Sequence, residues 1–450
     1  MRASSPPQYP RHGSAPGGDG TPVLCGARLA DGRTVDVRLG DGRILAVGTA
    51  GSLAGEAGGC GARVDLDGYL LLPAPVEAHA HLDTALTGAG GSGTSGGSGG
   101  VGGAGGPGGA GDAGSGSGVA GASEAAVADV QRRAVEAALL QLGHGATAVR
   151  THVRIGGAAG LGNLRAVLAA RAALRGLADV AAVAAAPVLT GVAGARGRSL
   201  LRDAVAMGAT AVGGCPDLDP DPVGYTDAVL RVAAEYGCAV DLHCDGADPA
   251  RLDRVAAVAA ELRSAVAVGP CGGLARMPYE TAAGVAERLA GAGVAVVCLP
   301  QGDCGAARGA GARPLAYAPV RLLRAAGVRV AAGSGAVRDA ANPVGRGDPL
   351  QSAYLLASAG EADPAAAYAT VAGQARAVLG LPEVRVAAGY PAELLAVRGD
   401  SVAGALSLGY SRIVIHRGRV VARTSAVREY CDSGAADLAL PRQGLRPTAG

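Results

Sequence analysis

Short apolar runs alternate along the chain with segments in which Ala, Leu and Arg recur at helical spacing. Between about residues 70 and 335 we count eight such runs of strand length, at 71–84, 146–153, 180–190, 209–217, 238–245, 264–272, 293–301 and 327–335. Helical periodicity fills the intervals, for example over 130–143 and 251–263. Strands that alternate with helices are typical of parallel βαβ units, and eight such units close a barrel of ~250 residues. The pattern therefore predicts an α/β chain with a TIM-like (β/α)8 barrel.

A second pattern flanks the predicted barrel, with shorter alternating runs separated by turn dipeptides. Over 23–72 the runs surround an Asp-Gly at 41–42, and 410–425 has the pattern of two strands around an Arg-Gly at 417–418. Asp-Gly between alternating apolar residues is a strong hairpin signal. We expect the N- and C-terminal segments to pair into one small composite β-sandwich domain. The predicted organisation is an N-terminal β-sandwich segment over 22–72, the barrel over 73–385 and a C-terminal β-sandwich segment over 386–425.

Three segments lack the apolar residues of a folded core. Residues 1–21 are polar and predict a disordered tail, and 426–450 form a C-terminal tail. Residues 88–122 are almost entirely Gly, Ser and Ala, which bury too little apolar area to offset their ordering entropy, so we expect a flexible Gly-rich insertion. A mobile lid over the pocket is one interpretation. Because a lid needs side chains that grip a ligand, a tolerated low-complexity insertion is favoured.

Composition narrows the class of protein and its partners. Hydrophobic residues make up 49% of the 450 residues, but there is no Phe and no Trp, so Ala, Val and Leu must fill the core. The 40 basic residues, all Arg, face 38 acidic ones, a balance that provides no field to attract nucleic acid. The apolar runs are too short to span a membrane, the N-terminus lacks a signal peptide's apolar core, and the nine Cys show no CxxC spacing. We expect a cytoplasmic protein with reduced thiols that binds a small molecule and neither nucleic acid nor membrane, and an oligomer is compatible with the sequence.

Three of the seven His residues lie where predicted strands end, and this is the edge at which such barrels place their active sites. His79 and His81 form a His-x-His at the end of the first strand, and period-two alternation directs both imidazoles to the same side. His243 lies near the end of the fifth strand. Three neutral imidazoles around an open position form a catalytic zinc site, and imidazole also suits iron. The sequence therefore predicts one divalent metal ion, zinc or iron, held by these three residues.

Three segments carry recognisable motifs: PAPVEAHAHLDTALTG at 73–88, GATAVRTHV at 145–153 and VDLHCD at 240–245. Together they resemble the first, second and fifth strands of the amidohydrolase superfamily, in its cytosine deaminase-like branch of metal-dependent hydrolases. The β-segments on both sides of the barrel also match, so the resemblance spans about residues 23–425. It implies a mononuclear metal, held by the three histidines, that activates water for hydrolysis of a non-peptide C–N bond, as in deamination of a cyclic amidine.

The chain departs from the family's pattern at four catalytic positions. The family places a proton-shuttling Glu three residues after the strand-five His, where this chain has Gly246. The strand-six His that orients the water corresponds to Pro270, and the strand-eight Asp, a metal ligand and general base, corresponds to Gly335. The Gln that recognises the substrate after strand three aligns with Val188. The first carboxylate after strand eight is Asp339, four residues late.

Two further residues are candidates for catalytic roles. Asp245 lies two residues after His243, which directs it to the same face as a ligand or base; in the interpretation that we favour, it matches the family's Asp that precedes the Glu. His152 ends strand two and is a candidate pocket residue, although the family's His at this place is not a ligand. Because the chain has no Lys, a carboxylated lysine that bridges two metals is excluded. We expect His144 near a helix C-terminus and His416 at the surface of the β-domain.

Two functions stay open on the sequence alone. The first is an amidohydrolase-type enzyme that uses one metal-activated water on a non-peptide C–N bond of a cyclic amidine or amide. Loss of the family's general acid/base removes a factor of roughly 10²–10⁴ in rate. The second is a catalytically impaired relative that binds a small ligand or a protein through the old pocket. The family resemblance favours the enzyme.

Overall fold

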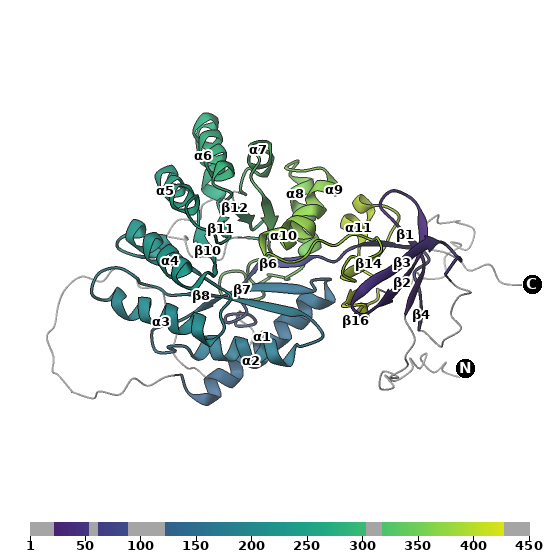
Figure 1. The fold of residues 1–450 in the computed structure, drawn as a ribbon, viewed down its shortest axis with the longest axis horizontal. Helices are drawn as coiled ribbons and strands as arrows, with labels where there is room; N and C mark the ends of the chain where they lie inside the picture. Colours follow the sequence, from purple (N-terminus) through teal and green to yellow (C-terminus); the bar gives the residue numbers. More distant parts are fainter. Residues whose placement is uncertain (1–21, 54–61, 89–121, 303–316, 427–450) are drawn as a thin grey trace, which may run out of the picture.

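Eight parallel strands form one sheet that curves into a barrel, in a computed structural model that describes residues 22–53, 62–88, 122–302 and 317–426 (Figure 1). The strands follow one another in chain order: β6 (Val76–Ala80), β7 (Ala148–Arg154), β8 (Asp179–Ala185), β9 (Ala211–Gly214), β10 (Ala239–Cys244), β11 (Val266–Pro270), β12 (Ala295–Cys298) and β13 (Val330–Ala332). The barrel closes just after β13, where Gly335 pairs with Ala80 and donates its backbone N–H to the His79 carbonyl at 2.9 Å. The predicted (β/α)8 fold is confirmed.

Each predicted barrel strand overlaps one of these elements, but the first prediction was too long. The run 71–84 divides between β5 (Tyr69–Pro73), which belongs to the β-domain, and β6, which begins the barrel. Pro73 and Pro75 lie at the junction, and proline cannot donate to a hydrogen-bonded ladder within a strand. One continuous apolar run therefore serves two sheets.

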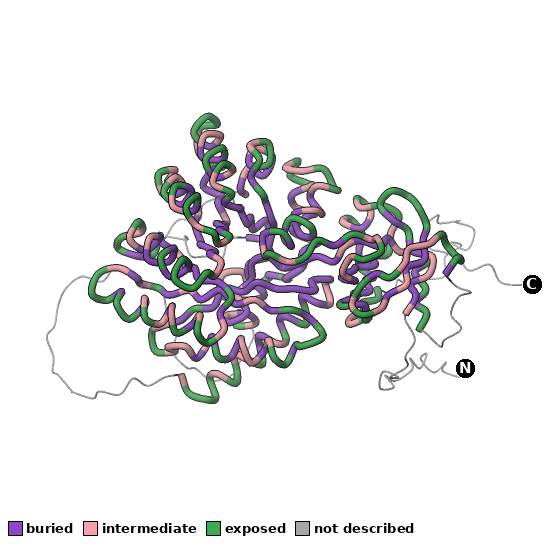
Figure 2. The backbone as a smooth tube through the Cα atoms, in the orientation of Figure 1, coloured by how far each residue is buried: buried purple, intermediate pink, exposed green. Residues whose placement is uncertain are grey.

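Helices cover the outside of the barrel, with exposed outer faces around buried strands (Figure 2). The barrel helices of the described residues are α1 (Glu124–Gly143), α2 (Gly162–Ala173), α3 (Gly194–Met207), α4 (Pro222–Tyr236), α5 (Pro249–Ala259), α6 (Tyr279–Gly291), α7 (Val320–Ala325), α8 (Pro349–Ser358), α9 (Pro364–Val371) and α10 (Gly373–Val378), with short 3-10 turns η1 (Pro216–Leu218) and η2 (Gly272–Arg276). The predicted helices at 130–143 and 251–263 correspond to α1 and α5.

Four of these helices begin at an Asp-Pro pair. Their carboxylates accept a backbone N–H of the first turn at 2.9–3.0 Å, and the capping residues are Asp221, Asp248, Asp348 and Asp363. The following Pro fits the first helical position because its missing N–H would have no partner there and its φ is already helical. These pairs fix where α4, α5, α8 and α9 start after the strands and loops that precede them.

The segments before and after the barrel share one sheet, in the order β16-β15-β14-β5-β1-β2-β3 with β4 on β1. Its strands, besides β5, are β1 (Val23–Arg28), β2 (Thr34–Gly40), β3 (Arg43–Thr49), β4 (Arg63–Asp65), β14 (Leu394–Arg398), β15 (Arg412–His416) and β16 (Arg419–Thr424), and α11 (Val402–Leu408) lies between β14 and β15. The antiparallel pairing of β5 with β14 joins the two chain segments and confirms the composite β-domain. Both hairpin predictions are also confirmed, since Asp41-Gly42 and Arg417-Gly418 have positive φ at both residues, as a type I′ turn requires.

The buried core of the described barrel is built mainly from Ala, Val and Leu, as the composition predicts. Tyr225 of α4 is its largest fully buried side chain, and the Tyr225 hydroxyl donates to the Ala186 carbonyl at 2.5 Å. None of the described helices is long and apolar enough to cross a membrane. The predicted tails and the Gly-rich insertion lie almost wholly outside the described residues, and the domain boundaries stay predictions.

Candidate metal centre

Three histidines converge at the carboxyl ends of β6 and β10. His79 lies on β6, His81 follows directly after it, and His243 lies on β10. His79 Nε2 and His81 Nε2 are 3.2 Å apart, and one ring nitrogen from each of the three residues lies within 4.8 Å of the others. His79 and His243 are buried, whereas His81 is half-buried. The structure thus brings together the three residues that the sequence predicts as metal ligands.

The spacing of these nitrogens suits a small divalent ion. Zinc binds nitrogen at ~2.0–2.1 Å in a tetrahedron, so that neighbouring ligand atoms lie about 3.3–3.4 Å apart. The 3.2 Å between His79 Nε2 and His81 Nε2 is close to this separation. The residues present therefore fit a three-imidazole site for one ion.

Burial keeps the imidazoles of His79 and His81 in the neutral form that binds a metal. Desolvation is the largest cause that lowers the pKa of His79, and the neighbouring rings of His152 and His243 lower it further. Desolvation also lowers the pKa of His81, against a smaller opposing effect of Asp83. A ligand must be the neutral imidazole, so both rings are prepared for metal binding at neutral pH.

A fourth histidine joins the cluster from β7. The His152 ring stacks on that of His79, with centroids 4.1 Å apart and planes inclined by 27°. His152 Nε2 lies 3.4 Å from Asp241 Oδ1, and Arg150 Nη1 donates to Asp241 Oδ2 at 3.1 Å. His152 therefore belongs to the cluster, while a catalytic role for it stays a prediction. Arg150 and Asp241 were not predicted, although each lies two residues before a histidine of its strand, so period-two alternation could have found them.

Glu77 is another unpredicted residue of this centre, two positions before His79 on β6. Its Oε1 accepts the backbone N–H groups of His79 and Ser334 at 3.0 and 2.9 Å, and its Oε2 accepts the Ser334 hydroxyl at 2.5 Å. Burial raises the pKa of Glu77 to about 7, although the hydrogen bonds from Ser334 act to lower it. Gly333 permits this contact, because a Cβ there would lie 2.9 Å from Glu77 Oε1. Glu77 thus ties β6 to the segment after β13.

The four positions that the resemblance marks as substituted present no ionisable side chain. Gly246 and Gly335 both have a φ of 74°, the left-handed region that favours glycine. A Cβ at Gly246 would lie 3.3 Å from Leu252 Cδ1, which is tighter than an ordinary contact. Pro270 ends β11, and Val188 lies half-buried in the loop after β8. The backbone at the two glycines is therefore adapted to having no side chain.

Asp339, the first carboxylate after β13, is committed to its own loop. Its Oδ2 accepts the Thr84 hydroxyl at 2.9 Å, and its Oδ1 accepts the backbone N–H groups of Ala341 and Asn342 at 2.8 and 3.0 Å. The residue is buried, and among the described residues it belongs to neither cluster that could hold a metal. Asp339 therefore anchors the loop to the segment after β6.

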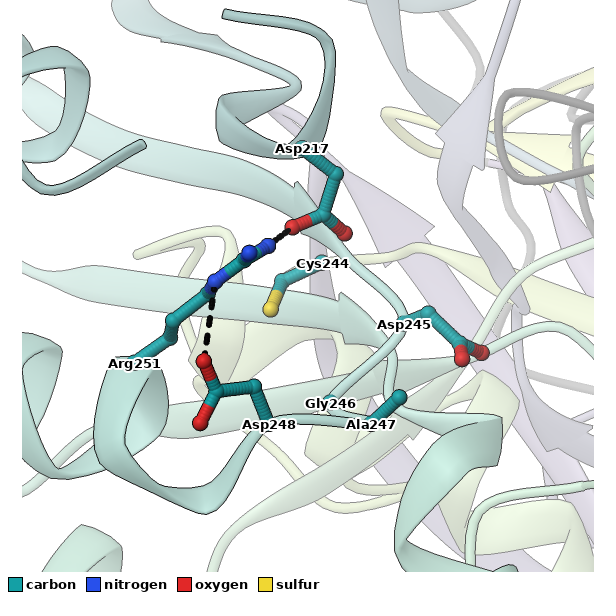
Figure 3. Close-up of a pocket in the computed structure, with 7 residues that line it drawn as sticks. All are labelled: Asp217, Cys244, Asp245, Gly246, Ala247, Asp248 and Arg251. Atoms are coloured by element: carbon teal, nitrogen blue, oxygen red, sulfur yellow. Dashed lines mark hydrogen bonds and ion pairs between the residues drawn. The ribbon is translucent and has the colours of Figure 1, made fainter. Parts of the chain in front are cut away.

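Asp245 belongs to neither histidine cluster of the described residues. β10 ends at Cys244, so the alternation that would direct Asp245 toward the cluster stops one residue earlier. Arg276 Nη2 donates to Asp245 Oδ2 at 2.5 Å. Asp245 also lines a pocket of about 290 Å³, in which Arg251 pairs with Asp217 (Figure 3). The structure thus gives Asp245 an ion-pair partner instead of a place in either metal cluster of the described residues, and its catalytic role stays a prediction.

The remaining two histidines of the described chain differ in outcome. His144 is the C-cap of α1, as predicted. His416 was predicted at the surface, and this was wrong: it is 1% exposed, and its Nδ1 lies 2.8 Å from Glu393 Oε2. β15 is covered on both faces, since Ile415 packs in the β-domain core and Val414 in the barrel core, so even the last residue of the strand is buried.

A parallel barrel with imidazoles gathered at the carboxyl ends of its strands defines a class of proteins whose active centre lies at that end. The model of the amidohydrolase family matches residues 110–422, well over half of the sequence, and the chain belongs to this family. Pterin deaminase from Rhizobium rhizogenes is 30% identical over 227 residues, which cover 47% of this chain and 52% of that protein. The chain thus spans about half the length of the curated relatives that it matches.

Two solved structures resemble the whole described fold. N-isopropylammelide isopropylaminohydrolase from Burkholderia multivorans has a TM-score of 0.72 at 25% identity, covering 90% of this chain and 99% of that one. 5-Methylcytosine deaminase from Klebsiella pneumoniae, liganded with 5-fluorocytosine, has a TM-score of 0.72 at 22% identity, covering 91% and 99%. The recognition of a deaminase-like amidohydrolase with a barrel and a composite β-domain is confirmed.

Proposed function

We propose that this protein is a metal-dependent hydrolase that cleaves a non-peptide C–N bond in a small cyclic amidine or amide, with one metal-activated water. The observation that carries the proposal is the convergence of His79, His81 and His243 within 4.8 Å at the carboxyl edge of the barrel. The names of the relatives support the substrate class, since pterin, ammelide and methylcytosine are all nitrogen heterocycles.

The three histidines would hold the ion, zinc or iron. A divalent ion supplies Lewis acidity that brings the pKa of water to about 7, and so a nucleophile at neutral pH. Burial keeps the imidazoles of His79 and His81 neutral. Glu77 fixes the backbone of His79 by accepting its N–H at 3.0 Å, and the stacked ring of His152 fixes the orientation of the His79 imidazole.

The proposed site has few side chains that could transfer a proton. Gly246 provides no carboxylate, which costs a rate factor of roughly 10²–10⁴ relative to a site with a general acid/base. His152 and Asp245 are the candidates that could move a proton. His152 is favoured because its ring centroid lies 5.6 Å from that of His81, whereas Asp245 is paired with Arg276. We therefore expect slow turnover.

The second candidate function is binding without catalysis. The left-handed backbone at Gly246 and Gly335 favours it, because two positions that the family uses for carboxylates have a conformation suited to glycine. In this case the histidine cluster would bind an ion, and the barrel mouth around it would bind a small ligand or a protein without hydrolysing it.

Metal content and ammonia release separate the two functions. Protein purified without chelators is analysed for zinc and iron, and then assayed on a panel of cytosines, pterins and aminotriazines. The enzyme predicts about one equivalent of metal and ammonia release that His81→Asn abolishes. His144→Asn, at the C-cap of α1, is the matched control and should keep both. Bound metal without ammonia release from any compound would support the binding function and contradict the enzyme.

A further inference from the structure

A second set of metal-ligating atoms lies beside the three predicted ligands. One ligand atom from each of His79, His152 and Asp241 lies within 4.8 Å of the others. We propose that these residues form a second metal position, which we call the inner position because Asp241 lies two residues nearer the amino end of β10 than His243. The triad of His79, His81 and His243 is the outer position. The inner position shares His79 with the site of the proposed function. An ion could bind there without His81 or His243, and whether or not the protein hydrolyses a substrate.

The spacing of its ligand atoms suits an ion. Zinc bonds of ~2.0–2.1 Å to nitrogen and ~2.0–2.2 Å to oxygen separate tetrahedral neighbours by about 3.3–3.5 Å. His152 Nε2 and Asp241 Oδ1 are 3.4 Å apart. The stacked rings of His79 and His152, with centroids 4.1 Å apart, bring the third ligand alongside. A single ion can therefore reach all three side chains with small adjustments.

The two facing atoms lack other partners. His152 Nε2 and Asp241 Oδ1 are buried and make no hydrogen bond to any residue that the structure describes. The residues themselves are 3% and 0% exposed. Buried polar atoms are nearly always paired, and these two lie close together without the geometry of a hydrogen bond. An ion between them would satisfy both atoms.

Arg150 orients Asp241 for this role. Its Nη1 donates to Asp241 Oδ2 at 3.1 Å and its Nη2 to the Val378 carbonyl at 3.4 Å, which leaves Oδ1 directed at His152. Partners that hold a ligating carboxylate in place are typical of metal sites. The Asp241 carboxylate is negatively charged and so attracts a cation, whereas the outer position has only neutral imidazoles. The positive charge of Arg150 offsets part of that attraction. The inner position is therefore selective for ions that accept both nitrogen and oxygen ligands.

The two positions exclude each other. A neutral imidazole has one lone pair, so His79 can serve only one ion at a time. The wild-type protein then binds one ion, which distributes between the two positions. An ion at the inner position occupies His152, and this removes a candidate for proton transfer in the proposed reaction. Removal of His81 and His243 should leave the inner position intact.

Co²⁺ titration of outer-position variants tests the proposal. The double variant His81→Asn/His243→Asn should retain about one equivalent of Co²⁺, with an altered visible absorption spectrum because a carboxylate replaces imidazoles as ligand. Adding Asp241→Asn should weaken Co²⁺ binding by about tenfold or more, as should adding His152→Gln, which leaves the Asp241–Arg150 pair in place. His144→Asn, added to the same double variant, is the matched control. Circular dichroism verifies that each variant is folded.

Absence of Co²⁺ binding in the folded double variant would overturn the inner position, as would unchanged affinity after His152→Gln. If Asp241→Asn does not fold, the His152→Gln result decides alone. The two proposals fail separately in this design. If the double variant binds Co²⁺ but the wild type shows no turnover, only the proposed function is contradicted. If the wild type shows turnover but the double variant binds no Co²⁺, only the inner position is contradicted.

Discussion

The two halves of the barrel mouth carry different chemistry. On one half, β6, β7 and β10 each bear a histidine with an ionisable residue two positions earlier: Glu77 and His79, Arg150 and His152, Asp241 and His243. On the other half, β11 ends at Pro270 and the segment after β13 reaches Gly335. The first half has side chains that could hold a cation, and the second has no ionisable side chain at the two positions that the resemblance aligns with a water-orienting His and a metal-binding Asp. The ionisable side chains at the barrel mouth are therefore concentrated on the strands β6, β7 and β10.

Removing the residue common to both metal positions should have the largest effect. His79→Asn takes a ligand from the outer and the inner position, so we expect Zn²⁺ affinity to fall by more than about a hundredfold, measured by competition with a chelating dye. His144→Asn should bind as the wild type does. Wild-type affinity in His79→Asn would show that the histidine-rich half of the mouth holds no ion.

Disconnecting the two halves should destabilise the barrel. Glu77→Leu leaves the N–H of His79 and both donors of Ser334 without their acceptor. Because these three donors stay buried without hydrogen-bond partners, the free energy of unfolding should fall by about 2–4 kcal/mol, measured by urea denaturation. Glu77→Gln keeps an acceptor and should cost about 1 kcal/mol. Equal stabilities of the Leu variant and the wild type would contradict the role of Glu77 as the tie between the halves.

Adding one carboxylate to each half of the mouth, at Gly246 after β10 and at Gly335 after β13, should have a moderate effect. Gly335→Asp with Gly246→Glu should raise Zn²⁺ affinity by about tenfold, because a carboxylate enters reach of the ion. Both positions have a φ of 74°, so each substitution should also cost about 1–2 kcal/mol of stability.

Gly335→Ala with Gly246→Ala is the matched control, with the same backbone strain and no carboxylate. If the acidic and the alanine variants bind Zn²⁺ equally, these positions do not face the ion, and their alignment with the family is wrong.

The smallest effect should come from Asp245. It is paired with Arg276 and lies outside both clusters, so Asp245→Asn should change Zn²⁺ affinity by less than about twofold. Asp241→Asn, on the same strand, should change it more. A larger loss in Asp245→Asn than in Asp241→Asn would return Asp245 to the metal centre and contradict the side-chain directions described above.

Much of the fold and some of the centre follow from the sequence through local periodicity. Alternating strand and helix patterns predict all eight barrel strands, and alternation with period two places His79 and His81 on one side. The same rule, continued two residues toward the amino end, reaches Glu77, Arg150 and Asp241. These three could have been predicted from the strands that carry the histidines.

The remaining features depend on contacts between distant segments. Ser334 meets Glu77 across 257 residues, and only the register with which β13 closes against β6 determines that contact. His416 is buried because the barrel covers one face of β15, and no pattern within that strand indicates it. Asp245 was expected on the inner face because the apolar run continues to residue 245, whereas β10 ends at Cys244. Strand ends and domain packing are set by tertiary structure.

The most direct measurement is the Zn²⁺ stoichiometry of the wild-type protein after equilibration with Zn²⁺ and removal of the excess, beside His79→Asn treated in the same way. The histidine cluster predicts about one equivalent in the wild type and less than about a tenth in the variant. Less than about a tenth of an equivalent in the folded wild type, or equal amounts in the two proteins, would contradict a metal centre at this barrel mouth.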